Sequence, residues 1–183
     1  MSKKHWMLLR IFVLPTVVDS KSMYIETIAQ ENMYGSQESV WSMVTDLTRF
    51  PSFFDGFMVI PSVKKIEVLY EEPVPGGKRK VYNSDGSILE EELLVFTSPV
   101  EHQYRLYGGF TFPFSWMIHE AYGTWNFSKV SDAQTSVAWT YRFHVRSRLL
   151  APLTYLVVKL FFTKAMSLCL KSMARTCAQE FTT

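Results

Sequence analysis

Residues 135–146 carry the pattern that most restricts how this chain can fold. Apolar side chains occupy every odd position from Val137 to Val145, and small, polar or charged residues occupy the even positions between them. A period of two places one face of a β-strand toward the interior and the other toward solvent. A sheet cannot bury its own apolar face, so a second layer has to cover it. The segment therefore predicts an amphipathic sheet whose cover comes from elsewhere in the chain.

Residues 149–180 are expected to supply that cover as one long helix. Pro152 suits the first turn of a helix. Apolar side chains recur at helical spacing in the second half, at Phe162, Met166, Cys169, Met173 and Cys177. Lys159 and Lys164 interrupt the most apolar stretch and make it a poor membrane-spanning helix. We expect the sheet to cover one side of this helix and a second partner to cover the other side of its first half.

The rest of the chain predicts further strands and two short helices, with no linker inside residues 23–181. Alternation or β-forming residues mark the predicted strands, at 23–34, 61–69, 78–82, 88–96, 104–107, 116–127 and 135–146. Ser36 is a fair N-cap for a helix that runs through Val44, and 46–55 is a second short helical piece. The expected class is α+β, with an antiparallel sheet of about six to seven strands.

Residues 1–22 stand apart as an N-terminal extension with four basic residues against Asp19. Their basic and then apolar order resembles a signal peptide, but Arg10 divides the apolar run and no small-residue cleavage site follows. An interfacial membrane anchor and a translation start at Met23 are the two alternatives, and the sequence does not choose between them.

Charge and cysteines bear on partners and location. The segment 142–175 contains seven basic residues and no acidic one, which favours an anionic membrane surface as a partner. Long apolar stretches separate these charges, so no nucleic acid is expected. Cys169 and Cys177 are eight residues apart, about 12 Å along a helix, which is too far for a disulfide. Reduced thiols predict a cytoplasmic protein, with membrane association left open.

No metal ion and no cofactor are expected. The four histidines are scattered, at His5, His102, His119 and His144, and no Cys/His pair has metal-ligand spacing. Dinucleotide and phosphate-loop fingerprints do not occur.

Several short motifs follow one another along the chain: Ser39–Asp46 with Phe50-Pro51, Gly77, Asp85-Gly86 with Glu91-Glu92, Phe96–Pro99 with Tyr104, Gly123-Thr124-Trp125, and Trp139–Phe143. In this order they resemble the START/Bet v 1-like superfamily, in particular its polyketide cyclase/dehydrase-like members. The resemblance covers about residues 24–178 and implies a helix-grip fold, in which a curved antiparallel sheet wraps a long C-terminal helix around a cavity. Members of the superfamily bind lipids, sterols or polyketides, and some are cyclases or hydrolases. The oligomeric state does not follow from it.

With the fold that the resemblance implies, the aromatic residues, 15% of the chain, are either solid core or the wall of a ligand cavity. The candidate ligand contacts are Tyr82, Tyr104, Phe110, Phe112, Phe114, Trp116, Trp125, Trp139, Tyr141, Phe143, Phe162 and Met166. The stretch 108–116 is a cavity lid, a loop that dips into a membrane, or an ordinary edge strand.

Three polar residues are candidate catalytic groups, although strand parity does not settle which glutamate points inward. Glu91 or Glu92 in an apolar cavity would have a raised pKa and could act as acid or base. His119 shares the parity of Trp125 and is expected to point inward.

The leading hypothesis is a non-catalytic carrier of a lipid, polyketide or isoprenoid. A cyclase or dehydratase acting on a polyketide-like substrate and a peripheral membrane or protein-interaction module are the alternatives.

Overall fold

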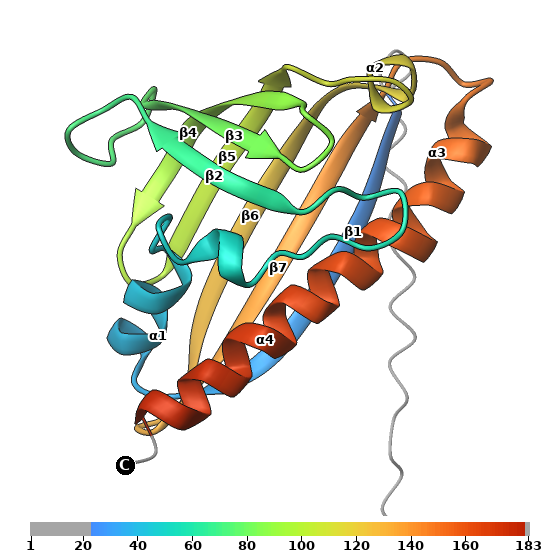
Figure 1. Cartoon of the computed structure of the whole chain (residues 1–183). Helices are drawn as coiled ribbons and strands as arrows, with labels where there is room; N and C mark the ends of the chain where they lie inside the picture. The colour runs from blue at the N-terminus through green and yellow to red at the C-terminus, as the bar shows by residue number, and fades with distance from the viewer. Residues whose placement is uncertain (1–22, 182–183) are drawn as a thin grey trace, which may run out of the picture.

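The computed structural model describes residues 23–181, so the predicted extension 1–22 lies outside the described residues. Within that range, seven strands form one antiparallel sheet in the order β1-β7-β6-β5-β4-β3-β2 (Figure 1). Their bounds are β1 Met23–Tyr34, β2 Val63–Val68, β3 Lys78–Asn83, β4 Ile88–Thr97, β5 Glu101–Gly108, β6 Ile118–Ser131 and β7 Gln134–Val145. Each strand from β2 to β6 pairs with the next along the chain, and β1 pairs with β7. The predicted α+β helix-grip architecture is confirmed.

Two short helical pieces follow β1, as predicted. Helix α1 spans Gln37–Val44, and the side chain of its N-cap Ser36 accepts a hydrogen bond from the backbone N–H of Ser39 at 3.2 Å. The second piece is a single 3-10 turn, Phe50–Ser52, and is shorter than the predicted 46–55. The apolar face of α1 is buried, which fixes this corner of the fold against the sheet.

The C-terminal helix is long, as predicted, but it is not a regular α-helix. It consists of α3 (Ala151–Val157), a π-helical turn (Val158–Phe162) and α4 (Thr163–Phe181). The hydroxyl of Thr163 donates to the carbonyl oxygen of Val158 at 2.9 Å, inside the widened turn. Figure 1 shows α4 lying diagonally across one face of the sheet, on the same side as α1.

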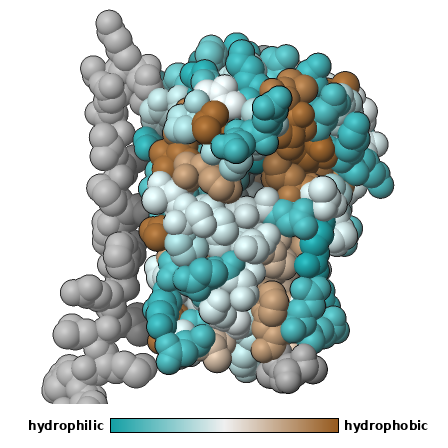
Figure 2. Space-filling model, turned by 90° about the vertical axis from the view of Figure 1, so that its left-hand side faces the viewer, coloured by the Kyte–Doolittle hydropathy of each residue, from teal (hydrophilic) through white to brown (hydrophobic). Residues whose placement is uncertain are grey.

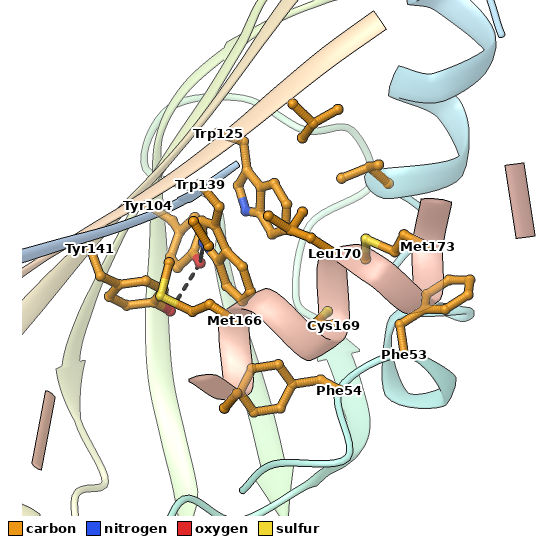
Figure 3. Packing of buried hydrophobic residues seen from close by; sticks show 14 of the residues in the cluster. Phe53, Phe54, Tyr104, Trp125, Trp139, Tyr141, Met166, Cys169, Leu170 and Met173 are labelled. Atoms are coloured by element: carbon orange, nitrogen blue, oxygen red, sulfur yellow. Dashed lines mark hydrogen bonds between the residues drawn. The ribbon is translucent and has the colours of Figure 1, made fainter. Parts of the chain in front are cut away.

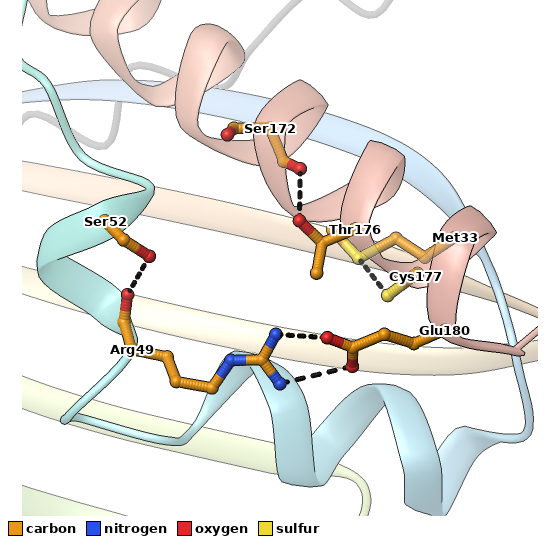
Figure 4. Close-up of polar contacts among 7 residues, drawn as sticks. All are labelled: Met33, Arg49, Ser52, Ser172, Thr176, Cys177 and Glu180. Atoms are coloured by element: carbon orange, nitrogen blue, oxygen red, sulfur yellow. Dashed lines mark hydrogen bonds and ion pairs between the residues drawn. The ribbon is translucent and has the colours of Figure 1, made fainter.

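The C-terminal end of α4 makes two contacts with the rest of the fold (Figure 4). Arg49 donates from Nη1 and Nη2 to the two carboxylate oxygens of Glu180, at 3.2 and 2.6 Å. The thiol of Cys177 lies 4.0 Å from the sulfur of Met33 on β1, in a fully buried contact. Burial raises the pKa of Cys177 to about 12, so this thiol stays protonated and unreactive. Cys169 and Cys177 are free thiols, as the spacing predicted.

The segment between β5 and β6 differs from the prediction. Residues 110–116 do not form an edge strand, and the predicted strand from Trp116 begins at Ile118 instead, because Phe114–Met117 form one helical turn, α2. The reason lies at Gly109, whose φ of +79° turns the chain out of β5. A Cβ at Gly109 would overlap the carbonyl oxygen of Ile88, so no larger residue fits this turn.

Apolar side chains remain exposed on the outer face of the C-terminal helix, at Leu153, Tyr155, Leu156 and Leu160. By length and composition alone, Ala151–Phe181 could cross a bilayer; 33% of its most apolar window is buried in this fold. The face of the molecule seen in Figure 2 is largely hydrophilic or neutral, with hydrophobic side chains gathered in its upper part.

Candidate functional site

A cavity lies between the inner face of the sheet and the segments that cover it. Strands β2 to β7 form its floor, and the covering wall comes from the end of α1, the loop 50–61, the segment 110–114 and Phe162. The cavity volume, counted as the space open to the centre of a water molecule, is about 140 Å³. On that measure one water needs about 10–15 Å³, so the cavity has room for roughly ten water molecules. Thr111 and Asp85 line it and are themselves exposed, so it reaches the surface beside them.

One wall of the cavity is a connected aromatic group (Figure 3). The indole N–H of Trp139 donates to the hydroxyl of Tyr104 at 3.0 Å, and that hydroxyl donates to Tyr141 at 2.9 Å. Trp125 stacks on Trp139 with ring centroids 4.1 Å apart. Burial raises the pKa of Tyr104 and of Tyr141, so both phenols stay protonated. The wall is therefore apolar with one line of hydroxyl groups on its surface.

A glycine on β6 makes the contact between Tyr104 and Tyr141 possible. Gly123 pairs with Tyr104 on β5 and with Tyr141 on β7, so it lies between the two phenols. A Cβ on Gly123 would overlap the ring of Tyr104. The ring of Tyr104 therefore lies across β6 and reaches Tyr141 only because position 123 is glycine.

The end of the cavity near β3 holds a buried charged group. Arg79 and Glu91 are directly paired residues of β3 and β4, and Arg79 Nε donates to Glu91 Oε1. Arg79 Nη2 lies 3.3 Å from His102 Nε2 on β5, and the guanidinium carbon lies 5.2 Å from the ring centre of Tyr104. All three polar residues are buried, and all three line the cavity.

Burial sets the charge of each member of this group. Desolvation raises the pKa of Glu91, and the positive charge of Arg79 opposes that rise. Desolvation, reinforced by Arg79, lowers the pKa of His102 well below its usual 6.5, so the imidazole is neutral at pH 7. Because arginine only donates, the Nε2 atom of His102 must be the acceptor in their contact. The cavity thus offers a ligand a long aromatic wall and one compact polar end.

The residues predicted from the sequence divide into two sets. Eight of the twelve candidate ligand contacts line the cavity: Tyr104, Phe110, Phe114, Trp125, Trp139, Tyr141, Phe143 and Phe162. The other four do not. Met166 is fully buried in the core, and Phe112 and Trp116 are exposed. Tyr82 does not line the cavity, and its hydroxyl donates a hydrogen bond of 2.6 Å to Glu67.

The three candidate catalytic residues also separate. Glu91 lines the cavity, whereas Glu92 contacts Arg105 at 2.7 Å on the outer face. His119 is exposed, so the expectation that it points inward is wrong. The pairing of β6 with β7 shifts between Ile118 and Glu120, and this β-bulge turns His119 outward. A simple parity count from Trp125 cannot detect the extra residue.

Sequence reasoning missed Arg79 and His102. The signal was present in the sequence. Arg79 lies two residues from Val81, and His102 lies two and four residues from Tyr104 and Leu106, so each shares a strand face with apolar residues. Strand parity alone would have turned both toward the interior. What the sequence could not give is that β3, β4 and β5 bring these residues together with Glu91.

Exposed apolar side chains occur within and next to the segment 110–114, which lines the cavity. Phe110, Thr111 and Phe114 line it, while Phe112 in the same loop is 78% exposed and Trp116 is 56% exposed. We call Phe112 and Trp116, with Leu149 at 92% exposure, the rim residues. The backbone N–H of Arg146 donates to the carbonyl of Met117 and so holds the segment that carries Leu149 beside α2.

Comparisons with known proteins agree with this geometry. A family model described as polyketide cyclase/dehydrase and lipid transport matches residues 35–178. The fold matches norcoclaurine synthase from Thalictrum flavum, in complex with dopamine and hydroxybenzaldehyde, with a TM-score of 0.66 at 10% identity over 100% of both chains.

Two further solved structures share the fold. The Zhui aromatase/cyclase from Streptomyces sp. R1128 matches with a TM-score of 0.64 at 13% identity, over 85% of this chain and 94% of that one. The protein XoxI from Bacillus cereus matches with a TM-score of 0.57 at 23% identity, over 82% of this chain and 94% of that one. No curated protein matches this sequence.

Proposed function

Because the chain belongs to the polyketide cyclase/dehydrase and lipid transport family, we propose that it binds and carries a hydrophobic small molecule in the cavity described above. The observation that carries the proposal is an aromatic chamber with a buried polar group at one end. Transfer of apolar surface from water drives such binding at about 25 cal/mol per Å². A ligand that buries about 300 Å² would gain about 7.5 kcal/mol before the cost of association.

The two ends of the cavity define the class of ligand. The aromatic wall suits a flat or branched apolar body of the lipid, polyketide or isoprenoid type. Arg79 and the hydroxyl of Tyr141 suit a carbonyl, hydroxyl or carboxylate group on that body, because both can donate hydrogen bonds. We therefore expect an amphipathic ligand rather than a plain hydrocarbon.

A cavity-filling variant tests this proposal. Ala121 lines the cavity and is buried, so Ala121→Phe fills the chamber from the sheet side. Ala138 lies on β7 with its side chain on the opposite face, so Ala138→Phe is the matched control. Native mass spectrometry with lipid extraction, followed by uptake of a fluorescent apolar probe, should show a ligand in wild type and in Ala138→Phe but not in Ala121→Phe. Equal probe uptake by all three proteins would contradict the proposal.

An enzymatic role is the second candidate, and a specific observation favours it. Glu91 is a buried carboxyl with a raised pKa inside the cavity, and such a group can exchange a proton with a bound carbonyl compound. Two structural neighbours are enzymes by name, a synthase and an aromatase/cyclase. A cyclase should convert a poly-carbonyl substrate and lose this activity in Glu91→Gln, whereas a carrier returns the molecule unchanged.

We place the carrier in the cytoplasm, in transient contact with anionic membranes. The free, buried thiols suit a reducing compartment. Phe112 adjoins Thr111, which lines the cavity, and the exposed Arg146 and Arg148 immediately precede Leu149 in the sequence. Apolar side chains flanked by cations suit the interface of an anionic bilayer, where a ligand could enter or leave the cavity.

A further inference from the structure

The bulge at the start of β6 gathers three metal-ligand side chains on the outer face of the sheet. Consecutive residues of a regular strand point to opposite faces, but the pairing shift between Ile118 and Glu120 interrupts that alternation at His119. Glu120 pairs directly with His144 on β7. Two strands therefore bring two imidazoles and one carboxylate together, although His119 and His144 are far apart in the sequence.

The distances suit one shared ion. One ligand atom from each of His119, Glu120 and His144 lies within 4.8 Å of the others. Nδ1 of His144 lies 3.5 Å from Oε1 of Glu120, and the two imidazole rings are 5.5 Å apart between centroids. Ligands at about 2.1 Å from a tetrahedral ion lie about 3.4 Å from one another. A small rotation of the exposed His119 side chain closes the remaining gap.

The surroundings hold two of the three groups in place. His144 stacks on the ring of Tyr24 at 4.9 Å between centroids, which fixes its orientation. Tyr122 donates to Oε1 of Glu120 at 3.0 Å, and Arg105 Nη1 lies 3.8 Å from Oε2. Hydrogen-bonded carboxylates and oriented imidazoles of this kind surround metal ligands in proteins.

One atom in the cluster lacks a hydrogen bond, although Oε1 of Glu120 lies 3.5 Å from it. Nδ1 of His144 is buried and makes no hydrogen bond within the described residues. Buried polar atoms are nearly always satisfied, so an unsatisfied one calls for a partner such as a bound ion.

We propose that His119, Glu120 and His144 bind a divalent zinc-type ion on the outer face of the sheet. Two imidazoles and one carboxylate are the ligand set of zinc sites that keep a fourth position open to water. Imidazole favours zinc, copper and nickel over magnesium and calcium, so the hard cations are not expected to compete. The site faces away from the cavity and does not depend on the ligand proposed for it.

The ion would connect the start of β6 to the end of β7. These strand ends adjoin α2 and the segment leading to α3, which carry the rim residues Trp116 and Leu149. A metal link here would therefore stabilise the backbone next to the cavity opening, and it would bind the folded chain in preference to the unfolded one.

Titration of the metal-free full-length chain with Zn²⁺ by calorimetry tests the proposal. We expect one ion per chain and a melting temperature that rises by about 5–10 °C at a hundredfold excess over Kd. His119→Ala removes an exposed side chain and should keep the fold. Glu120→Gln keeps the hydrogen-bonding shape of the side chain and removes its charge. Each variant should weaken Zn²⁺ binding at least tenfold.

Two controls make the result decisive. His5→Gln alters a histidine outside the described residues and should leave binding within twofold. Co²⁺ should give the visible absorption of a tetrahedral site in wild type and lose it in His119→Ala. Binding that survives both cluster variants, binding that disappears in His5→Gln, or equal affinity for Mg²⁺ would overturn the assignment.

Discussion

Removal of either partner of the buried ion pair should destabilise the protein, but with different pH dependence. Glu91→Leu leaves the Arg79 guanidinium buried without its anion, and this group cannot lose its proton at any ordinary pH. Breaking a buried pair in this way costs about 3–5 kcal/mol. No protonation change in this variant relieves that cost, whereas the raised pKa of Glu91 gives the wild type a pH dependence of its own.

Arg79→Met leaves a carboxyl that can take up a proton. Burial already raises the pKa of Glu91, and loss of Arg79 removes the charge that opposes the rise. The folded pKa then exceeds the unfolded value of about 4.3, so stability is retained below that value and lost as pH rises. Holding the carboxyl neutral therefore costs little near pH 5, and the cost grows as the pH rises toward 7.

Urea denaturation at both pH values, followed by tryptophan fluorescence and circular dichroism, measures these costs against the wild type. The double variant Arg79→Met/Glu91→Leu replaces the pair by apolar groups and should lie within about 1 kcal/mol of wild type, or above it. If the deficit of Arg79→Met is the same at pH 5 and pH 7, or if Glu91→Leu costs under about 1 kcal/mol, the pair is not a desolvated one and the reasoning is refuted.

The same double variant separates stability from function. If the pair serves the ligand, the stable double variant should lose affinity for an amphipathic probe by tenfold or more and keep affinity for a plain hydrocarbon. Unchanged binding of both probes would show that the polar end has no part in recognition.

Three further predictions concern other parts of the molecule. His102 stays neutral in the folded protein but takes up a proton below about pH 6.5 when the chain is unfolded, so the free energy of unfolding decreases as the pH is lowered. Between pH 6.0 and 5.0 in urea titrations, wild type should therefore lose up to about 1.2 kcal/mol more than His102→Gln, and an equal loss in both proteins would count against a neutral imidazole. Gly123→Ala should cost about 2–4 kcal/mol in the same assay, because the Tyr104 ring must leave its place and the Trp139 N–H loses its acceptor; a neutral effect would show that the ring can move freely. Phe112→Ser should reduce co-sedimentation with anionic liposomes several-fold without changing the melting temperature, whereas Tyr34→Ser, exposed at the far end of β1, should not; equal sedimentation by both variants would remove the rim from the membrane contact.

Much of the fold was predictable because its signals are local. The alternation from Val137 to Val145 located β7 and its buried face, and Ser36 located the start of α1. The apolar stripe from Phe162 to Cys177 identified the covering helix. Each of these patterns depends on a few neighbouring residues, and each matches the periodicity of a regular element.

The misplaced elements all involve a departure from regular geometry. His119 was assigned to the wrong face because one extra residue in β6 reverses the parity count. The π-helical turn at Val158–Phe162 and the helical turn at Phe114–Met117 leave no periodic trace in the sequence, since each contains only four or five residues.

The candidate site was predictable in its apolar half and, at its polar end, in Glu91 alone. Aromatic residues on inward strand faces could be listed from the sequence, and most of that list lines the cavity. The group formed by Arg79, Glu91 and His102 could not be assembled, because three strands have to align before those residues meet. The cluster of His119, Glu120 and His144 depends on strand pairing in the same way.

The widened turn in the C-terminal helix sets which side of its first half meets the sheet. Thr154, Val158 and Met166 are all buried on the sheet side, and Phe162 between them lines the cavity. Residues of an ideal α-helix advance by about 100° each, so over the twelve residues from 154 to 166 it would turn about 120° past three full turns. The extra residue in the π turn absorbs most of that angle. Deletion of a single residue there would rotate Leu153 and Leu156 relative to the sheet. The number of residues in this segment, more than their type, therefore determines which leucine side chains are exposed to solvent.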